Sequence, residues 1–219
     1  MSDSKALKIV KTARNIVLVN CLWLLFSIPV ITIGAATCAV FYLNFKLLEN
    51  EDAPLWENFI KGFKSSFVQG TVMLVFTALF GGCLFFIWST ALNSDSFIMK
   101  AGAFICSLLF IMFYIYTFPL IARYNNSFKN IFKNSAGMSF TYMWKTIIIV
   151  LLAAFFYVIF CWNFWTLVVG GVFIPGLFMY IMSRIVKTMF VQMEYHAETV
   201  KAEAEAAAEE ISKETSDSE

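Results

Sequence analysis

Four long apolar tracts without any charged residue constrain the fold of this chain more than any other feature. Asp, Glu, Lys, Arg and His are absent from residues 15–45, 65–94, 101–122 and 146–183. A bilayer core about 30 Å thick requires about 20 apolar residues per helix, and only helices or closed barrels satisfy the backbone there. Only 14% of the residues are charged, against roughly a quarter in a soluble domain. The sequence therefore predicts an all-α, polytopic integral membrane helix bundle with the lipid bilayer as its partner.

The number of crossings follows from the tract lengths and from their turn signals. The two middle tracts each predict one helix. The last tract is too long for one crossing, and Gly170-Gly171 near its middle predicts the turn of a helical hairpin. The first tract is long for one span and short for two, with Pro29 and Gly34 at its centre. We predict five to six transmembrane helices as three hairpins, the first broken at Pro29 and Gly34 and either complete or re-entrant.

The positions of Lys and Arg predict the topology, because these residues accumulate on the cytoplasmic side of a membrane. Residues 1–14 contain four of them and are expected inside. An even number of crossings also puts the cation-bearing segments 46–64, 123–145 and 184–187 inside. We therefore expect a multi-pass protein of the cell membrane with both termini in the cytoplasm.

This topology divides the chain into three regions. Residues 1–14 form a basic cytoplasmic N-terminus, residues 15–193 a transmembrane domain, and residues 194–219 an acidic cytoplasmic tail. The tail begins with Ala and Glu, which favour helix, and ends in a polar stretch that predicts disorder.

The segment after the first tract predicts an amphipathic helix. Trp56, Phe59 and Phe63 recur at helical spacing, while Lys64 lies on another face. The pattern of Phe, then Phe-Lys four residues on, then Ser recurs at residues 128–135. We predict two cytoplasmic interfacial helices with aromatic residues in the acyl boundary and lysines at the phosphates. They serve either as membrane anchors or as docking helices for a partner protein.

The polar residues exclude several chemistries. The four apolar tracts lack the Asp, Glu or His of an intramembrane proton relay, and the single histidine, His196, lies in the tail. No cluster suits a metal or an acid–base pair, and the five cysteines lack paired spacing. The chain is not basic enough for nucleic acid. We expect no enzyme activity, no cofactor and no metal.

Arg184 is the candidate functional residue within the membrane. If the last helix starts near Gly171, Arg184 lies about 20 Å along it, and an ionisable residue at that depth indicates function. The alternative is snorkelling to the headgroups. Three asparagines are predicted to form hydrogen bonds between helices: Asn20, Asn44 and Asn163.

Three segments carry a resemblance to a known family. They are residues 20–37, the helix with Phe59 and Phe63-Lys64, and residues 119–125 with Arg123, Tyr124 and Asn125. Together they resemble the YesL-like family of bacterial membrane proteins, a domain of unknown function (number 624). The likeness extends from about residue 13 to residue 190 and excludes the acidic tail. It implies an accessory or regulatory role in carbohydrate (oligosaccharide) uptake beside a carbohydrate ABC transporter permease, with no catalytic residues to carry over.

Two hypotheses about function follow. In the first, the protein is a non-enzymatic accessory or regulator of a carbohydrate permease and acts through its cytoplasmic helices. In the second, it is a small-molecule carrier whose site is formed by the broken first hairpin (Pro29 and Gly34) and Arg184. A carrier needs a polar cavity at mid-membrane, whereas an accessory protein needs only packed helices and an exposed surface.

Overall fold

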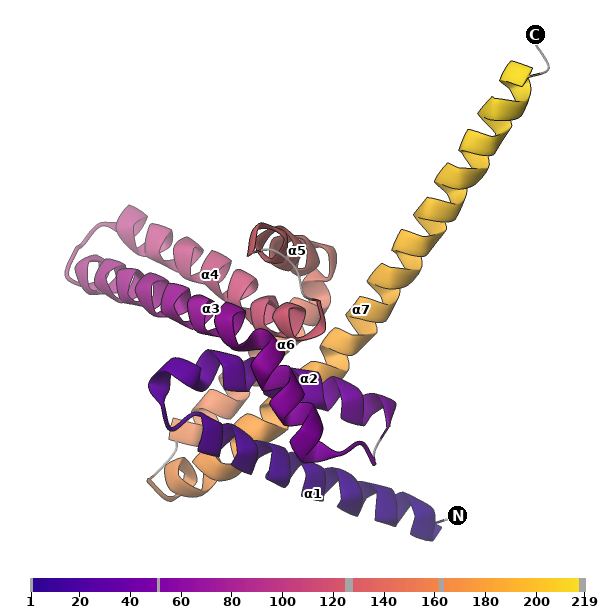
Figure 1. Ribbon diagram of the computed structural model, residues 1–219. Coiled ribbons are helices and arrows are strands. Elements are labelled where there is room, and N and C mark those ends of the chain that lie inside the picture. The colour runs from indigo at the N-terminus through magenta and orange to yellow at the C-terminus, as the bar shows by residue number, and fades with distance from the viewer. Residues whose placement is uncertain (1, 51, 125–127, 162–163, 217–219) are drawn as a thin grey trace. The chain divides into compact units, whose positions relative to one another are not determined.

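All regular structure in the described residues is helical. The computed structural model describes residues 2–50, 52–124, 128–161 and 164–216, and these ranges contain seven α-helices, one short 3-10 helix and no strand (Figure 1). In chain order the elements are α1 (Ser2–Phe26), η1 (Val30–Thr32), α2 (Ile33–Glu49), α3 (Leu55–Leu92), α4 (Phe97–Arg123), α5 (Phe128–Thr141), α6 (Met143–Cys161) and α7 (Phe164–Ser216).

The chain divides into two compact units, Met1–Arg184 and Ile185–Glu219. The first contains α1 to α6 and the beginning of α7. The second contains the rest of α7, which stays helical as far as Ser216. The helical part of the predicted tail therefore reaches Ser216, and residues 217–219 lie outside the described residues.

Five helical segments are long and apolar enough to cross a membrane: Ala6–Phe26, Val30–Glu49, Leu55–Leu92, Phe97–Arg123 and Phe173–Glu205. The pair α5 and α6 also qualifies as one broken span, with a bend of 95° between its two helices. The described residues thus provide five or six candidate spans, and the predicted all-α membrane bundle is confirmed.

The first apolar tract forms two helices with a break at Pro29. Because Pro29 lacks a backbone N–H, α1 ends at Phe26 and the chain restarts through η1. The Thr32 hydroxyl donates to the carbonyl oxygen of Phe26 at 2.6 Å, which closes the break. Across it, Trp23 Nε1 donates to Thr37 Oγ1 at 3.1 Å. The predicted broken hairpin is thus a pair of helices, and Gly34 lies inside the second.

The hairpin of α2 and α3 is the packing centre of the first unit. Ala35, Ala36 and Ala39 are fully buried, because α3 approaches α2 closely. A Cβ atom added to Gly70 would lie 2.8 Å from the backbone nitrogen of Ala35. Small residues at such crossings allow the helix backbones to approach and make close van der Waals contact.

The predicted interfacial helix at residues 56–67 is the beginning of α3 and not a separate element. α3 runs without interruption for 38 residues, about 57 Å at 1.5 Å per residue, so it is longer than a bilayer core is thick. Figure 1 shows that α3 bends between its first turns and its longer second part. The position of the first turns at the membrane surface stays a prediction.

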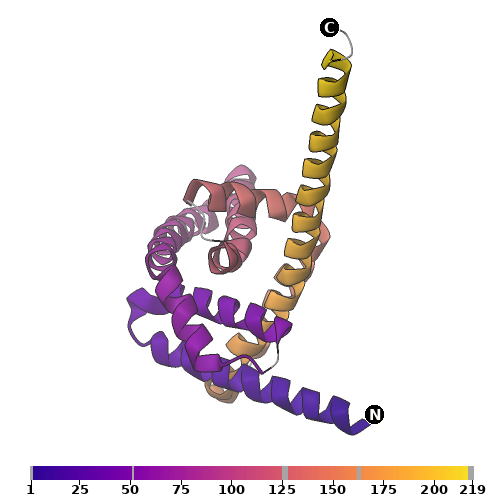
Figure 2. The same cartoon turned by 45° about the vertical axis from the view of Figure 1, so that its right-hand side comes forward.

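α4 packs against α3 on one side and against α5 on the other. α3 and α4 lie side by side in both views (Figure 1 and Figure 2), and Trp88 Nε1 donates to Ser107 Oγ at 2.8 Å between them. α5 runs back along α4, since the Ser139 hydroxyl donates to the carbonyl oxygen of Met112 at 2.6 Å. The second predicted surface helix is therefore a separate element that packs on α4 before the chain bends into α6.

The predicted turn at Gly170-Gly171 is wrong. Both glycines lie within α7, which begins at Phe164, and the connection from α6 falls at residues 162–163, outside the described residues. The reason is that a helix in lipid satisfies its own backbone groups, so glycine is tolerated in a membrane helix at positions where it would end a helix in water.

Candidate functional site

A cavity of about 720 Å³ lies among α1, α2 and the first part of α7. Ile and Leu side chains line part of it, and its polar lining residues are Lys8, Thr12, Asn15, Asn44, Tyr180 and Arg184. The lining thus combines two cationic side chains, two carboxamides and two hydroxyls with no carboxylate. Such a set of donors can bind an anion.

Arg184 reaches this cavity because a buried hydrogen bond fixes α7 against α2. Asn44 Nδ2 donates to Ser183 Oγ at 3.2 Å, and both residues are buried. Ser183 Oγ in turn donates to the carbonyl oxygen of Met179 at 2.7 Å. The prediction that Asn44 joins two helices is confirmed. Arg184 itself is exposed and forms no hydrogen bond or ion pair with any described residue.

The start of α7 changes the depth computed for Arg184. Because α7 begins at Phe164 and not near Gly171, Arg184 lies about 30 Å along the helix at 1.5 Å per residue. That length equals the thickness of a bilayer core. The candidate span itself begins at Phe173, from which Arg184 lies about 17 Å along the helix, so the depth of Arg184 in the membrane stays a prediction.

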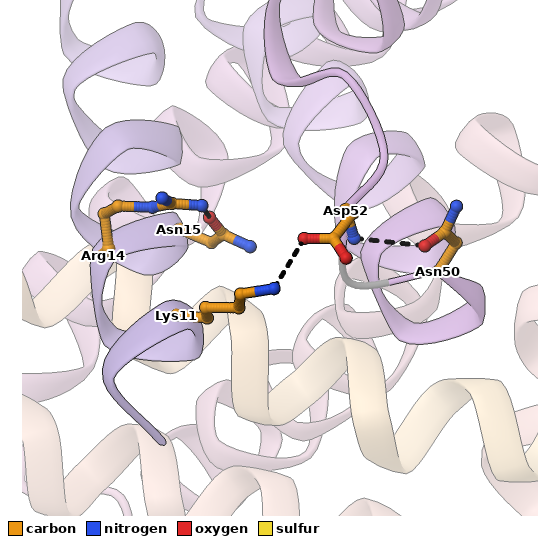
Figure 3. A network of polar contacts seen from close by, with 5 residues as sticks. All are labelled: Lys11, Arg14, Asn15, Asn50 and Asp52. Atoms are coloured by element: carbon orange, nitrogen blue, oxygen red, sulfur yellow. Dashed lines mark hydrogen bonds and ion pairs between the residues drawn. The ribbon is translucent and has the colours of Figure 1, made fainter. Parts of the chain in front are cut away.

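Polar contacts hold α1 beside the turn between α2 and α3 (Figure 3). Lys11 Nζ lies 3.0 Å from Asp52 Oδ1, and the Asp52 backbone N–H donates to Asn50 Oδ1 at 3.1 Å. Next to Lys11, Arg14 Nη2 donates to Asn15 Oδ1 at 3.3 Å. Exposed ion pairs stabilise a fold by less than about 1 kcal/mol, so these contacts orient α1 and contribute little to stability.

The lining of the cavity brings the beginning of α1, the end of α2 and Arg184 close to one another. All three segments are among those that the charge pattern assigns to one side of the membrane. The side of the membrane that they face stays a prediction.

The two helices of the first hairpin line the cavity, but the break between them at Pro29 and Gly34 does not. Pro29 and Gly34 are absent from its lining, and eleven residues of α1 separate Asn15 from Phe26, about 16 Å. Gly34 instead contacts Gly70 where α2 crosses α3. The structure therefore does not bring Pro29, Gly34 and Arg184 into one site.

The aromatic residues of the predicted interfacial helix have two different surroundings. Phe59 is fully buried, and the rings of Phe59 and Phe63 lie 5.0 and 5.1 Å from the ring of Phe26 on α1. Trp56 is 57% exposed, and Lys64 is also exposed. The Trp56 ring also lies 6.0 Å from the Phe26 ring. All three aromatic residues therefore join α3 to α1, while Trp56 and Lys64 keep exposed surface for lipid or a partner.

The two copies of the Phe, Phe-Lys, Ser pattern occupy similar places in two helical hairpins. Phe63 packs on α1, and Phe132 packs on α4, with its ring 4.2 Å from the ring of Phe113. The serines that end the two copies, Ser66 and Ser135, are both buried. The repeated pattern thus lies in the helix that follows α2 in the first case and α4 in the second.

The family-like segment at the end of α4 is remote from the cavity lining. Arg123 is the last residue of α4, and its guanidinium carbon lies 5.8 Å from the centre of the Tyr124 ring. The Tyr124 backbone N–H donates to the carbonyl oxygen of Leu120 at 2.9 Å and ends the helix. Asn125 lies outside the described residues, as does Asn163.

Sequence reasoning missed several of the cavity residues. Lys8 was assigned only to the basic N-terminus, and Asn15 and Tyr180 were not selected as site residues. One sequence feature could have pointed to the cavity: Asn15 and Asn44 are polar residues at the two ends of the first apolar tract. Their convergence with Arg184 depends on the fold.

The spans and their connections define a multi-pass helical membrane protein. The family described as "Protein of unknown function, DUF624" matches residues 16–88, which cover most of α1, all of α2 and most of α3. Residues 16–88 are thus similar to this family, and because the family includes the YesL-like proteins, the predicted resemblance is confirmed over these residues. No curated protein and no solved structure matches the chain.

Proposed function

We propose that the protein is a non-enzymatic accessory or regulatory component of carbohydrate uptake that associates with a carbohydrate ABC transporter permease. The link to carbohydrate uptake comes from the YesL-like resemblance. The four apolar tracts contain no acid, base or histidine from which to build an active site.

One observation carries the choice of an accessory protein over a carrier. The middle of α2, including Ala36, Cys38 and Ala39, is fully buried. Small apolar side chains and the close crossing with α3 fill this central region, whereas the cavity lies toward the N-terminal part of α1 and the end of α2. A carrier needs its polar site near mid-membrane, so tight packing there supports the accessory role.

The exposed face at the start of α3 supplies a surface for the permease. Trp56 is 57% exposed, and Glu57, Lys61 and Lys64 are exposed on the same turns. Exposed tryptophans beside charged groups are enriched in protein interfaces and often dominate their binding energy.

Affinity capture of the tagged full chain from membranes in mild detergent tests this proposal. We expect permease subunits of a carbohydrate ABC transporter to co-purify, and Trp56→Ala to reduce their recovery. Trp144→Ala is the matched control, because Trp144 is 82% exposed at the start of α6 and should leave recovery unchanged. Absence of transporter subunits, together with normal carbohydrate uptake in a deletion strain, would contradict the proposal.

A second candidate function is a small-molecule carrier that uses Arg184. The observation that favours it is the cavity in which Arg184 meets Lys8, Asn15 and Tyr180. Uptake into proteoliposomes that contain the purified chain alone distinguishes the two functions, because an accessory protein transports nothing without its permease.

A further inference from the structure

Two cationic side chains line the cavity among α1, α2 and α7. They are Lys8 and Arg184, and the lining contains no Asp or Glu. Arg184 has no acceptor among the described residues, whereas cationic side chains in membrane helices are normally paired. The exposed guanidinium is therefore available to an anionic group from outside the chain, and its planar set of donors matches a phosphate group.

Neutral donors beside the two cations fit the same ligand. Asn15 is 6% exposed, and its carboxamide and the Tyr180 hydroxyl line the cavity. The volume of about 720 Å³ falls in the range of roughly 300–1,000 Å³ that holds a small organic ligand. The cavity thus has room for more than a phosphate ion.

The apolar part of the lining indicates what else the ligand contains. Ile16, Leu47 and Leu48 line the cavity, and Ile9 at its edge is 69% exposed. The neighbouring Leu7 and Val10 on α1 are 61% and 64% exposed. The cavity therefore opens beside an apolar surface of a candidate span, where acyl chains lie.

We propose that this cavity binds the phosphate group of an anionic amphiphile, with Arg184 and Lys8 as its cationic partners. A membrane phospholipid has this chemistry: its phosphate would lie at the level of Arg184 and its chains against Ile9 and Ile16. A soluble phosphate ester shares the phosphate but lacks the chains. This inference does not depend on the accessory role or on the carrier role.

The test measures lipid binding to the purified full chain in neutral detergent by native mass spectrometry. The probes are dioleoyl phosphatidylglycerol and dioleoylglycerol, which has the same chains and no phosphate. The variants are Arg184→Gln, Arg184→Lys and Lys8→Gln, all at exposed positions where the fold is expected to persist. Lys100→Gln is the matched control, because it removes one positive charge from an exposed residue of α4 outside the cavity.

We expect phosphatidylglycerol to bind in preference to dioleoylglycerol. Loss of a charge-assisted contact should weaken this binding by about tenfold or more in Arg184→Gln and Lys8→Gln. Arg184→Lys should bind with intermediate affinity because Lys cannot form the bidentate contact, and Lys100→Gln should bind as the wild type does.

Glycerol phosphate in the same assay identifies the source of the phosphate. If it displaces no lipid, the ligand is a phospholipid. If it binds alone with the same dependence on Arg184 and Lys8, the ligand is a soluble phosphate ester and the assigned chemistry holds. Equal binding of the two lipids, or wild-type binding by both Gln variants, would overturn the proposal.

Discussion

The crossing of α2 and α3 gives the sharpest prediction of stability. In Gly70→Ala, the new Cβ atom would lie 2.8 Å from the Ala35 backbone nitrogen and 2.8 Å from the Gly34 carbonyl carbon. Ordinary van der Waals contact begins at 3.4 Å. All of these neighbours are backbone atoms, which no side-chain rotation can move away. The two helices must therefore separate by several tenths of an ångström along their interface.

The size of the effect follows from two opposing contributions. Overpacking of a tight interface costs about 1–3 kcal/mol, whereas replacing glycine by alanine inside a helix stabilises it by about 0.5–1 kcal/mol. We expect a net loss of up to about 2.5 kcal/mol in the free energy of unfolding. Gly82→Ala in the same helix is the matched control, since its Cβ atom would meet nothing within 4 Å.

Unfolding by sodium dodecyl sulfate in mixed micelles, followed by circular dichroism, measures both variants. Because both gain the same helix propensity, the difference between them isolates the packing term, which we expect to be about 1–3 kcal/mol. A Gly70→Ala protein as stable as Gly82→Ala would refute the close crossing of α2 and α3.

Three further predictions concern the topology, the buried pair of Asn44 and Ser183, and the cysteines. Reporter fusions at Glu219 and after Asp95 should report inside and outside respectively, and an outside Glu219 would end the proposed topology. Asn44→Ala should lower the free energy of unfolding by about 0.6–1.7 kcal/mol. If the Asn44 and Ser183 side chains act as a hydrogen-bonded pair, adding Ser183→Ala should cost little more, and fully additive losses would contradict such a pair. Replacing all five cysteines by Ala should leave a protein that stays monodisperse in detergent, because those that the structure describes have free thiols; loss of folding traced to one cysteine pair would refute this.

Local features of the sequence predicted the spans and the first break, because both depend on local chemistry. An apolar tract must form a helix in lipid wherever it lies, and a proline ends a helix through its own missing N–H. Gly170 and Gly171 misled the same reasoning, since the cost of glycine in a helix falls when no water competes for the backbone. The second apolar tract begins after Lys64, but this point marks only a change in charge, because α3 has already begun at Leu55.

The candidate site could be predicted only in part, because its residues are distant in the sequence. Asn44 and Ser183 are 139 positions apart, and no periodicity or spacing links them. Arg184 was identifiable because its charge follows a long apolar tract, whereas the role of Lys8 depends on how α1 packs. Single unusual residues are thus visible in a sequence, and the cavities that they share are visible only in the fold.

The burial of α2 has a consequence for biosynthesis. This helix contains three Ala and one Gly among its 17 residues and carries Asn44 and Lys46, so it gains less than a Leu-rich helix when it leaves the translocon for lipid. Its polar and small side chains find their partners only after α3 has been translated and, for Asn44, after α7. Retention of α2 in the bilayer therefore depends on helices that the ribosome makes later, and a nascent chain that stops before α3 should hold α2 weakly.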